Sequence, residues 1–212
     1  MTDQPAPRSS GSDARGGTAD ALLDATERLL VSEGPAALST RRIAEEAGQS
    51  HGLIRYHFGS VENLMIRCLE RATERILARQ RRLYAGDEPF LDKWRTAMAY
   101  LEEDLRSDPF PKLAAELLAL GWNQPAYQDA LRRMMDGFTA VLSDAVRAAL
   151  AEYGSSRPGV AVDVEALATL IRTSQLGMIA ERLAGVDTGH TAMLQAIDGW
   201  LQGLSTAPRR SR

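Results

Sequence analysis

A short stretch of the chain gathers side chains that can donate hydrogen bonds to a nucleic acid or accept them from it. Amide, hydroxyl, imidazole, guanidinium and phenol groups follow one another there, with one glycine and one leucine among them. The residues are Gln49, Ser50, His51, Gly52, Leu53, Arg55, Tyr56 and His57. Polar groups of these types read base edges in a DNA groove and hold phosphates, and a leucine can add an apolar contact. We therefore expect this stretch to present the face of a helix that reads DNA.

Two short helices are predicted to position this face. Ser39 can cap a helix over residues 40–47, and Gly48 stands where a left-handed residue would end it. Ser50 can cap a second helix over residues 51–58. One apolar side would hold the two helices at a fixed angle, and it consists of Ile43, Ala44, Ala47, Ile54 and Phe58. Such a pair, braced by a preceding helix, is typical of the helix-turn-helix, which places its second helix in the major groove.

The chain resembles the TetR family of transcriptional regulators in the run LSTRRIAEEAGQSHGLIRYHFGS, residues 38–60. The resemblance covers roughly residues 18–66, and the rest matches the family only in its helical layout. It implies a homodimer that binds an operator in double-stranded DNA through its second and third helices. It also implies a variable carboxy-terminal domain that encloses a small-molecule effector, and a last pair of helices that pack across a two-fold axis.

The same resemblance assigns roles to residues of the helix-turn-helix. It places Thr40, Tyr56 and His57 at phosphate-contacting positions, and Arg41 at or beside the base-reading face together with residues 49–55. Two residues depart from the family pattern, since Arg55 stands where tyrosine is frequent and Val61 replaces a lysine that usually contacts a phosphate. Losing one phosphate contact per subunit should weaken DNA affinity and flatten its salt dependence by about one unit per contact, without erasing specificity.

The composition favours an all-α fold of about nine helices. Hydrophobic residues make up 44% and charged residues 25%, as in ordinary globular proteins, which excludes wholesale disorder, collagen-like repeats and a coiled-coil rod. Alanine, leucine and arginine recur while aromatics reach only 6%, a mixture that favours helices over strands. We expect an amino-terminal helix-turn-helix DNA-binding domain followed by a helical ligand-binding and dimerisation domain.

Glycine, proline and polar clusters divide the chain into five segments. Residues 1–17 are expected to be a disordered leader, and residues 205–212 a flexible basic tail. Between them we expect the DNA-binding domain over 18–64, a connecting helix over 65–84 and the ligand-binding and dimerisation domain over 85–204.

The charge is distributed unevenly over these segments. The whole chain carries a net charge of -3, but residues 1–84 hold 12 basic and 11 acidic residues, a net +1. Residues 85–212 hold 13 basic and 17 acidic residues, a net -4. The positive end, which suits a nucleic acid, is therefore the amino-terminal one.

Patterns of other protein classes are missing from the sequence. Cys68 is the single cysteine, and His51 and His57 are six residues apart, which excludes a disulfide framework and argues against a metal site. No nucleophile paired with a base, phosphate-cradling loop or carboxylate pair suggests catalysis. Residues 1–17 lack the apolar core of a secretory signal, and no run of about 18 apolar residues predicts a membrane span. We expect a cytoplasmic protein that is not an enzyme, with no catalytic residues, cofactor, metal or membrane partner.

An apolar effector pocket is predicted in the carboxy-terminal half. Methionine and aromatic side chains at helical spacing suit a cavity for varied ligands, although the same pattern also serves ordinary packing. The predicted lining is Trp94, Met98, Trp122, Tyr127, Met134, Phe138 and Met178, with Gln175 as a polar anchor.

The last two helices carry more apolar surface than one side of a domain needs. Pairing with the same helices of a second copy would bury it in a four-helix bundle, plausibly over more than ~1,000 Å². The predicted interface is Leu170, Ile171, Gly177, Ile197, Trp200, Leu201 and Leu204. The alternative is that these faces close the core of the domain itself.

These patterns favour a ligand-responsive regulator, most simply a repressor. Three alternatives stay open: a helical hairpin that merely packs in a core, an enzyme or binding protein that keeps an unused helix-turn-helix, and a regulator controlled by a protein partner. Val61 is the one residue that supports an unused helix-turn-helix.

Overall fold

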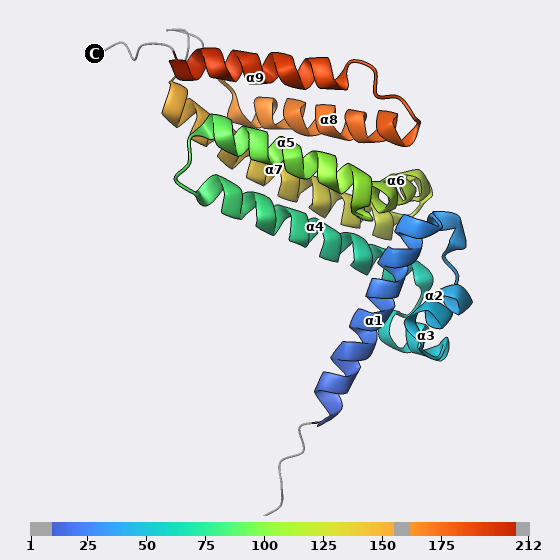
Figure 1. Ribbon diagram of the computed structural model, residues 1–212. Helices are drawn as coiled ribbons and strands as arrows, with labels where there is room; N and C mark the ends of the chain where they lie inside the picture. Colours follow the sequence, from blue (N-terminus) through green and yellow to red (C-terminus); the bar gives the residue numbers. More distant parts are fainter. Residues whose placement is uncertain (1–9, 155–161, 207–212) are drawn as a thin grey trace, which may run out of the picture. The chain divides into compact units, whose positions relative to one another are not determined.

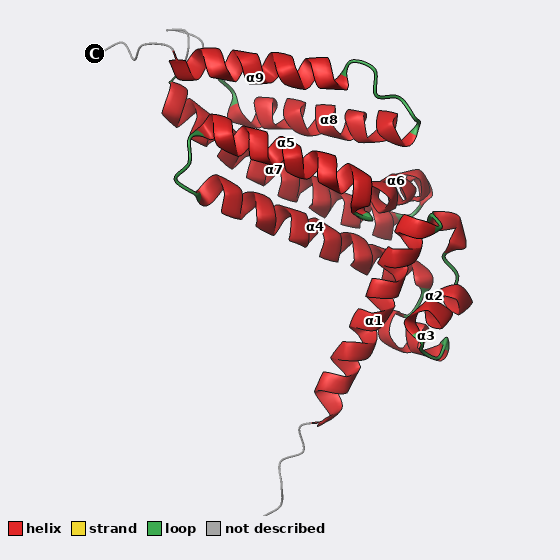
Figure 2. Ribbon diagram, viewed as in Figure 1, coloured by secondary structure: helices red, strands yellow, loops and turns green. Residues whose placement is uncertain are grey.

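The computed structural model describes residues 10–154 and 162–206 (Figure 1). Over these ranges every regular element is helical, as Figure 2 shows, and the all-α prediction is confirmed. Their bounds are α1 Ser10–Ser32, α2 Thr40–Ala47, α3 Gly52–Phe58, α4 Val61–Ala85, α5 Phe90–Ser107, α6 Phe110–Leu120, α7 Pro125–Tyr153, α8 Val164–Leu183 and α9 His190–Thr206. Two single 3₁₀ turns, Pro35–Ala37 and Gly121–Asn123, precede α2 and α7.

The chain divides into two compact units, Met1–Leu69 and Glu70–Arg212. Helix α4 belongs to both, since its residues up to Leu69 lie in the first unit and the remainder in the second. The predicted boundary after residue 64 therefore falls inside this uninterrupted helix. No helix in the described ranges has the length and apolar character needed to cross a membrane.

The first unit packs α1, α2, α3 and the start of α4 around a small, fully buried core. Side chains of all four helices in it have at most 1% of their surface exposed: Leu22, Leu29, Leu30, Ile43, Ile54, Leu64 and Leu69. The Thr26 hydroxyl is buried among them and donates to the Leu22 carbonyl oxygen at 2.8 Å, so its polar atom is satisfied. Helices as short as α2 and α3 are not stable in isolation, and packing against this core stabilises them.

Two predictions about helix starts in this unit are wrong. From its residue type, Thr18 is expected to cap the first helix, but α1 begins at Ser10, eight residues earlier. Residues 10–17 are therefore helical, and only residues 1–9 of the predicted leader lie outside the described residues. No proline follows Pro7 in this stretch, and a nucleated helix can therefore extend through Gly16 and Gly17 at a modest cost. Ser50 is not the cap of α3, because that position is taken by His51.

The second unit is a bundle in which α4, α5, α7, α8 and α9 run alongside one another, with α6 at one end (Figure 1). Helix α7 packs along α8, and α5 packs against α9. The Glu152 carboxylate on α7 accepts from the Phe90 amide at 2.9 Å, which caps the first turn of α5. Asp163 caps α8 in the same way through the Ala166 amide at 3.0 Å.

Ion pairs join the outer helices of this bundle. The Arg95 guanidinium on α5 donates to both carboxylate oxygens of Asp198 on α9, at 2.8 and 3.0 Å. This forked contact lowers the pKa of Asp198 below its usual value. Arg182 on α8 makes a similar contact with Glu102 on α5, at 3.1 and 3.3 Å. Residues 205 and 206 of the predicted tail continue α9, and 207–212 lie outside the described residues.

Candidate DNA-binding face and effector cavities

The turn between α2 and α3 is fixed by local hydrogen bonds. The Ser39 hydroxyl accepts from the Arg42 amide at 3.2 Å, which confirms Ser39 as the cap of α2. Gly48 ends α2 in the left-handed region, at φ 63° and ψ 31°, where a residue with a Cβ would be strained. The Gln49 amide then donates back to the Ala44 carbonyl at 2.9 Å. These contacts define the path of the chain into α3.

Two adjacent arginines of α2 do different work. Arg42 donates to Glu33 and to Glu46, and Arg28 on α1 also binds Glu46 at 3.0 Å, so this network ties α2 to α1. The Arg28 guanidinium is the main reason that the pKa of Glu46 lies below its usual value. The Arg41 side chain is 89% exposed, and among the described residues it pairs within its own helix, with Glu45 at 2.8 Å. Because such exposed pairs contribute little stability, Arg41 could exchange Glu45 for a DNA contact.

The predicted DNA-reading residues remain accessible to a partner. None of the ten is buried: Thr40, Arg41, Gln49, Ser50, His51, Gly52, Leu53, Arg55, Tyr56 and His57. Tyr56 is the most conspicuous, with 67% of its surface exposed and its ring edge-on to His57 at a centroid distance of 4.9 Å. The apolar side of the same helices lies inward, where Ile43, Ala44 and Ile54 are buried. The structure thus separates a packed side from a polar outer side, as the sequence pattern indicates.

The corner between α3 and α4 depends on a side chain that the sequence analysis missed. Asn63 donates from its side-chain nitrogen to the Phe58 carbonyl at 3.0 Å, and its amide donates to the Ser60 hydroxyl at 3.1 Å. The serine three residues before Asn63 was the available signal, since this spacing is typical of a helix start. Gly59 supplies the sharp turn at φ 79°.

The start of α4 carries no cation. Val61, its first residue, is partly exposed and uncharged, and the neighbouring Glu62 is exposed. Hydrogen bonds from its own backbone amide and from Ser60 lower the pKa of the Glu62 carboxyl, so it is ionised at neutral pH. If this end of α4 lies near a DNA phosphate, the Glu62 carboxylate faces it, and the lysine usual in the family is absent.

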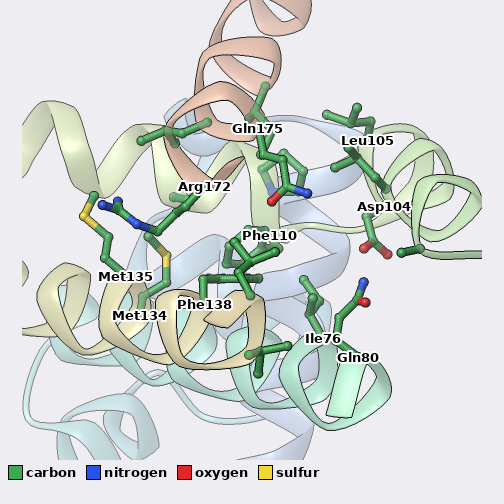
Figure 3. A pocket seen from close by; sticks show the side chains of 18 of the residues that line it. Ile76, Gln80, Asp104, Leu105, Phe110, Met134, Met135, Phe138, Arg172 and Gln175 are labelled. Atoms are coloured by element: carbon green, nitrogen blue, oxygen red, sulfur yellow. The ribbon is translucent and has the colours of Figure 1, made fainter. Parts of the chain in front are cut away.

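The second unit encloses a cavity of about 90 Å³ between α4, α5, α6, α7 and α8. Figure 3 shows its lining, in which Phe110 and Phe138 lie between polar groups at opposite sides. Three residues of the predicted pocket line it, namely Met134, Phe138 and Gln175.

A larger cavity of about 410 Å³ lies between α5, α7, α8 and α9. It is lined by Trp94, Met98 and Met178 of the predicted pocket, and again by Gln175. Tyr84 and Leu142 also line both cavities, so the two are neighbours that share one wall. The predicted lining is therefore distributed over two cavities.

Two residues of the predicted pocket lie elsewhere. Tyr127 is only 1% exposed and lines neither cavity, and its Cβ lies close to Gly121. Helical spacing placed Tyr127 on an inward face but could not tell a filled position from a hollow one. Nothing is described of the Trp122 side chain.

Polar groups of the smaller cavity were missed by the sequence analysis. They are Gln80, Asp104 and Arg172. The signal for Arg172 was its position on an otherwise apolar stripe of α8, between Ala168 and Ile179. Asp104 is buried and paired with Arg79, whose guanidinium also lies over the Tyr100 ring at 4.3 Å. Burial outweighs this pairing and raises the pKa of Asp104.

The predicted dimer residues divide into an outer and an inner set. Leu170 and Trp200 are each 62% exposed, and beside Gly177 a Cβ would meet no other atom. Leu201, in contrast, is buried in the core of the unit with Phe90, and Ile197 and Leu204 pack against the same cluster. Within one chain, α9 therefore turns Leu201 toward its own bundle. Ile171 is partly buried and lines the larger cavity.

Comparisons with known proteins identify the first unit most clearly. Residues 22–68 match the family model described as bacterial regulatory proteins, tetR family. The chain is 26% identical over 190 residues to the HTH-type transcriptional repressor AcnR of Corynebacterium glutamicum, covering 84% of this chain and 89% of the relative.

Solved structures share the fold. One is GusR of Salmonella enterica, 22% identical, with a TM-score of 0.66 over 90% of this chain and 96% of that one. Another is a TetR transcription regulator from Haloarcula marismortui, 18% identical, with a TM-score of 0.68 over 90% and 97% of the two chains. At these identities the likeness concerns the fold alone.

Proposed function

The chain belongs to the TetR family of transcriptional regulators, and from this premise we propose that it is a cytoplasmic repressor released from DNA by a small-molecule effector. It binds a near-palindromic operator as a homodimer. The relative that is named a transcriptional repressor supports the direction of control. The cavities of the second unit support control by a small molecule over control by a protein partner.

The observation that carries this proposal is the accessible polar face of α2 and α3 on a braced corner. Arg41 and Tyr56 are both largely exposed. Ser39 and Gly48 cap the two ends of α2, and the ion pairs of Arg42 brace that helix. Preorganised donors of this kind can position the chain on phosphates and read base edges without first ordering a loop.

Apolar residues left uncovered on α8 and α9 support dimerisation. Leu170 and Trp200 expose most of their surfaces, and Gly177 and Gly199 have open space where a second helix could approach closely. A two-fold axis through this surface pairs it with itself. Two recognition helices would then lie about 34 Å apart, or a multiple of this distance, to meet successive major grooves.

Release by the effector requires different affinities for two conformers. An effector that bound both equally would shift nothing, however tightly it bound. The cavities lie in the second unit and α4 belongs to both units, so one helix connects the effector site to the DNA-binding region covalently. The effector favours a conformer whose recognition helices no longer match the operator spacing.

Operator titrations with Arg41→Ala and Tyr56→Ala test the proposal. Each variant should lose DNA affinity by roughly tenfold or more per site, on the order of 1–3 kcal/mol, while remaining dimeric. Fluorescence anisotropy at several salt concentrations, with a selected operator fragment, measures both affinity and its salt slope.

Arg147→Ala is the matched control for these titrations. Arg147 is also an exposed arginine paired within its own helix, at 2.7 Å from Asp144, but it lies on α7 in the second unit. It should leave operator affinity unchanged. Unchanged affinity in both Arg41→Ala and Tyr56→Ala would instead remove this face from the DNA-binding site.

A further inference from the structure

In the described part of the chain, the smaller cavity has one cationic side chain that makes no ion pair. Arg172 of α8 lines this cavity, and its Nε atom is buried without a hydrogen-bond acceptor. In the part of the chain that the structure describes, no carboxylate lies within ion-pair distance of its guanidinium. A buried donor left unsatisfied costs free energy that a suitable ligand would recover.

The one carboxylate of the cavity is already occupied. Asp104 pairs with Arg79, and Arg75, one turn earlier on α4, pairs with Asp108 at 2.9 Å. Figure 3 places Asp104 and Arg172 at opposite sides of the cavity, with Phe110 and Phe138 between them. The charges of Asp104 and Arg79 therefore balance each other, and the positive charge of Arg172 is left over.

The rest of the wall is apolar and limits the size of a ligand. Phenylalanine, methionine, leucine and isoleucine side chains predominate in the lining, and Gln80 and Gln175 are its uncharged polar groups. A volume of about 90 Å³ suits a small ligand. A doubly charged or sugar-like molecule would leave polar groups unpaired against this wall.

We propose that this cavity binds a small monocarboxylate with an apolar body, whose carboxylate pairs with Arg172. A guanidinium and a carboxylate match in a two-pronged contact that is stronger than a neutral hydrogen bond. The apolar body lies against Phe110 and Phe138. Binding of the acid does not depend on DNA. Only its role as the effector rests on the proposed function.

Calorimetric titration of the full chain with benzoate and with benzamide tests the charge requirement. The two molecules have the same number of non-hydrogen atoms and nearly the same shape, but only benzoate is an anion at neutral pH. Benzoate should bind at least tenfold more tightly, and hexanoate should likewise bind more tightly than hexanamide. Equal binding within each pair, or no binding by either acid at millimolar concentration, would overturn the proposal.

Variants of Arg172 locate the binding site. Arg172→Gln should weaken benzoate binding at least tenfold with little effect on benzamide, and Arg172→Lys should retain part of the preference for the anion. Arg132→Gln removes the same charge from an exposed position of α7 and should bind benzoate like the wild type. Benzoate affinity within twofold of wild type in Arg172→Gln would place the acid elsewhere.

Operator binding, measured separately, distinguishes the two proposals. An operator complex that forms normally, in a chain that binds neither acid, would contradict the monocarboxylate site and leave the repressor function standing. Benzoate binding through Arg172 in a chain that selects no operator would contradict the repressor function and leave the site standing.

Discussion

The two units of the chain differ in how fully they bury their apolar side chains. In the first unit, side chains such as Leu22, Ile43 and Ile54 are fully buried, and the exposed side of α2 and α3 is polar. The second unit leaves two cavities inside its bundle and exposes Leu170 and Trp200 on its surface. The first unit buries its apolar side chains within one chain, whereas the second unit has space inside it and apolar surface outside it for other molecules.

This difference indicates where each kind of recognition resides. A tightly packed scaffold suits the reading of DNA, because exposed polar groups must be held in a fixed geometry. A bundle with voids can adopt more than one packing at a small difference in free energy, which suits a response to ligands. Under the proposed function, the tightly packed unit reads DNA and the unit with cavities responds to the effector.

Removal of core volume tests this contrast most strongly. Ile54→Ala should cost about 2–5 kcal/mol of stability, the usual range for fully buried sites. Leu142→Ala should cost less, about 1–3 kcal/mol, because Leu142 borders both cavities and has fewer atoms to lose contact with.

Urea unfolding followed by two signals assigns each loss to its unit. All three tryptophans, Trp94, Trp122 and Trp200, belong to the second unit, so their fluorescence reports that unit alone, while circular dichroism reports both. Ile54→Ala should shift the circular dichroism transition more than the fluorescence transition. Equal shifts of the two signals would show that the units do not differ in the way described.

Leu170→Glu tests the uncovered face of α8. A charge buried at the centre of a dimer interface costs at least about 2 kcal/mol, so the dissociation constant of the dimer should rise by roughly 30-fold or more. Val186→Glu is the control, since Val186 is also exposed and apolar but lies in the connection between α8 and α9. Sedimentation equilibrium measures both variants; an unchanged dimer in Leu170→Glu would refute this interface.

The burial of Tyr84, in the wall between the two cavities, can be tested by the pH dependence of stability. Burial raises the pKa of its phenol to about 12, so the folded chain holds the proton more tightly than the unfolded chain does. Its contribution to stability is complete below pH 10 and is lost as the pH rises toward 12. At pH 11 the wild type should have lost about 1.4 kcal/mol of stability through this phenol, and Tyr84→Phe should not show that loss.

Urea titrations between pH 9 and 11 make this comparison. Tyr56→Phe, which changes a phenol that is 67% exposed, is the control and should keep the alkaline loss of the wild type. An alkaline loss of the same size in Tyr84→Phe as in the wild type would mean that the phenol is not buried in the bundle.

The smallest expected effect concerns Val61. Val61→Lys adds a cation at the start of α4 and should steepen the salt dependence of operator binding by about 0.9 units per new phosphate contact. Val61→Gln is the matched control, because it adds length and polarity without charge. A salt slope that stays the same in Val61→Lys would show that the start of α4 does not reach the DNA backbone.

Local chemistry explains why the first unit could be predicted from sequence in detail. Ser39 and Gly48 act on backbone groups within a few residues, so their roles can be predicted without knowing the fold. Ser50 is not the cap of α3, because the adjacent His51 takes that position. Two candidate caps next to each other cannot be ranked by residue type alone.

The cavities could be predicted only in part. Helical spacing predicts that Met134 and Trp94 face inward, but whether an inward residue fills space or borders a void depends on how several helices pack together. Tyr127 and Leu201 point inward and are surrounded by their own unit. Arg172 was passed over because a charge on an apolar stripe usually extends its end to solvent.

Selection of genomic DNA fragments by the purified full chain tests the central claim most directly. The account predicts enrichment of an inverted repeat whose half-sites are centred about 10 base pairs apart or a multiple of this spacing. The enrichment should disappear with Tyr56→Ala. A folded, dimeric chain that enriches no sequence over competitor DNA, or enriches only a site without symmetry, would contradict it.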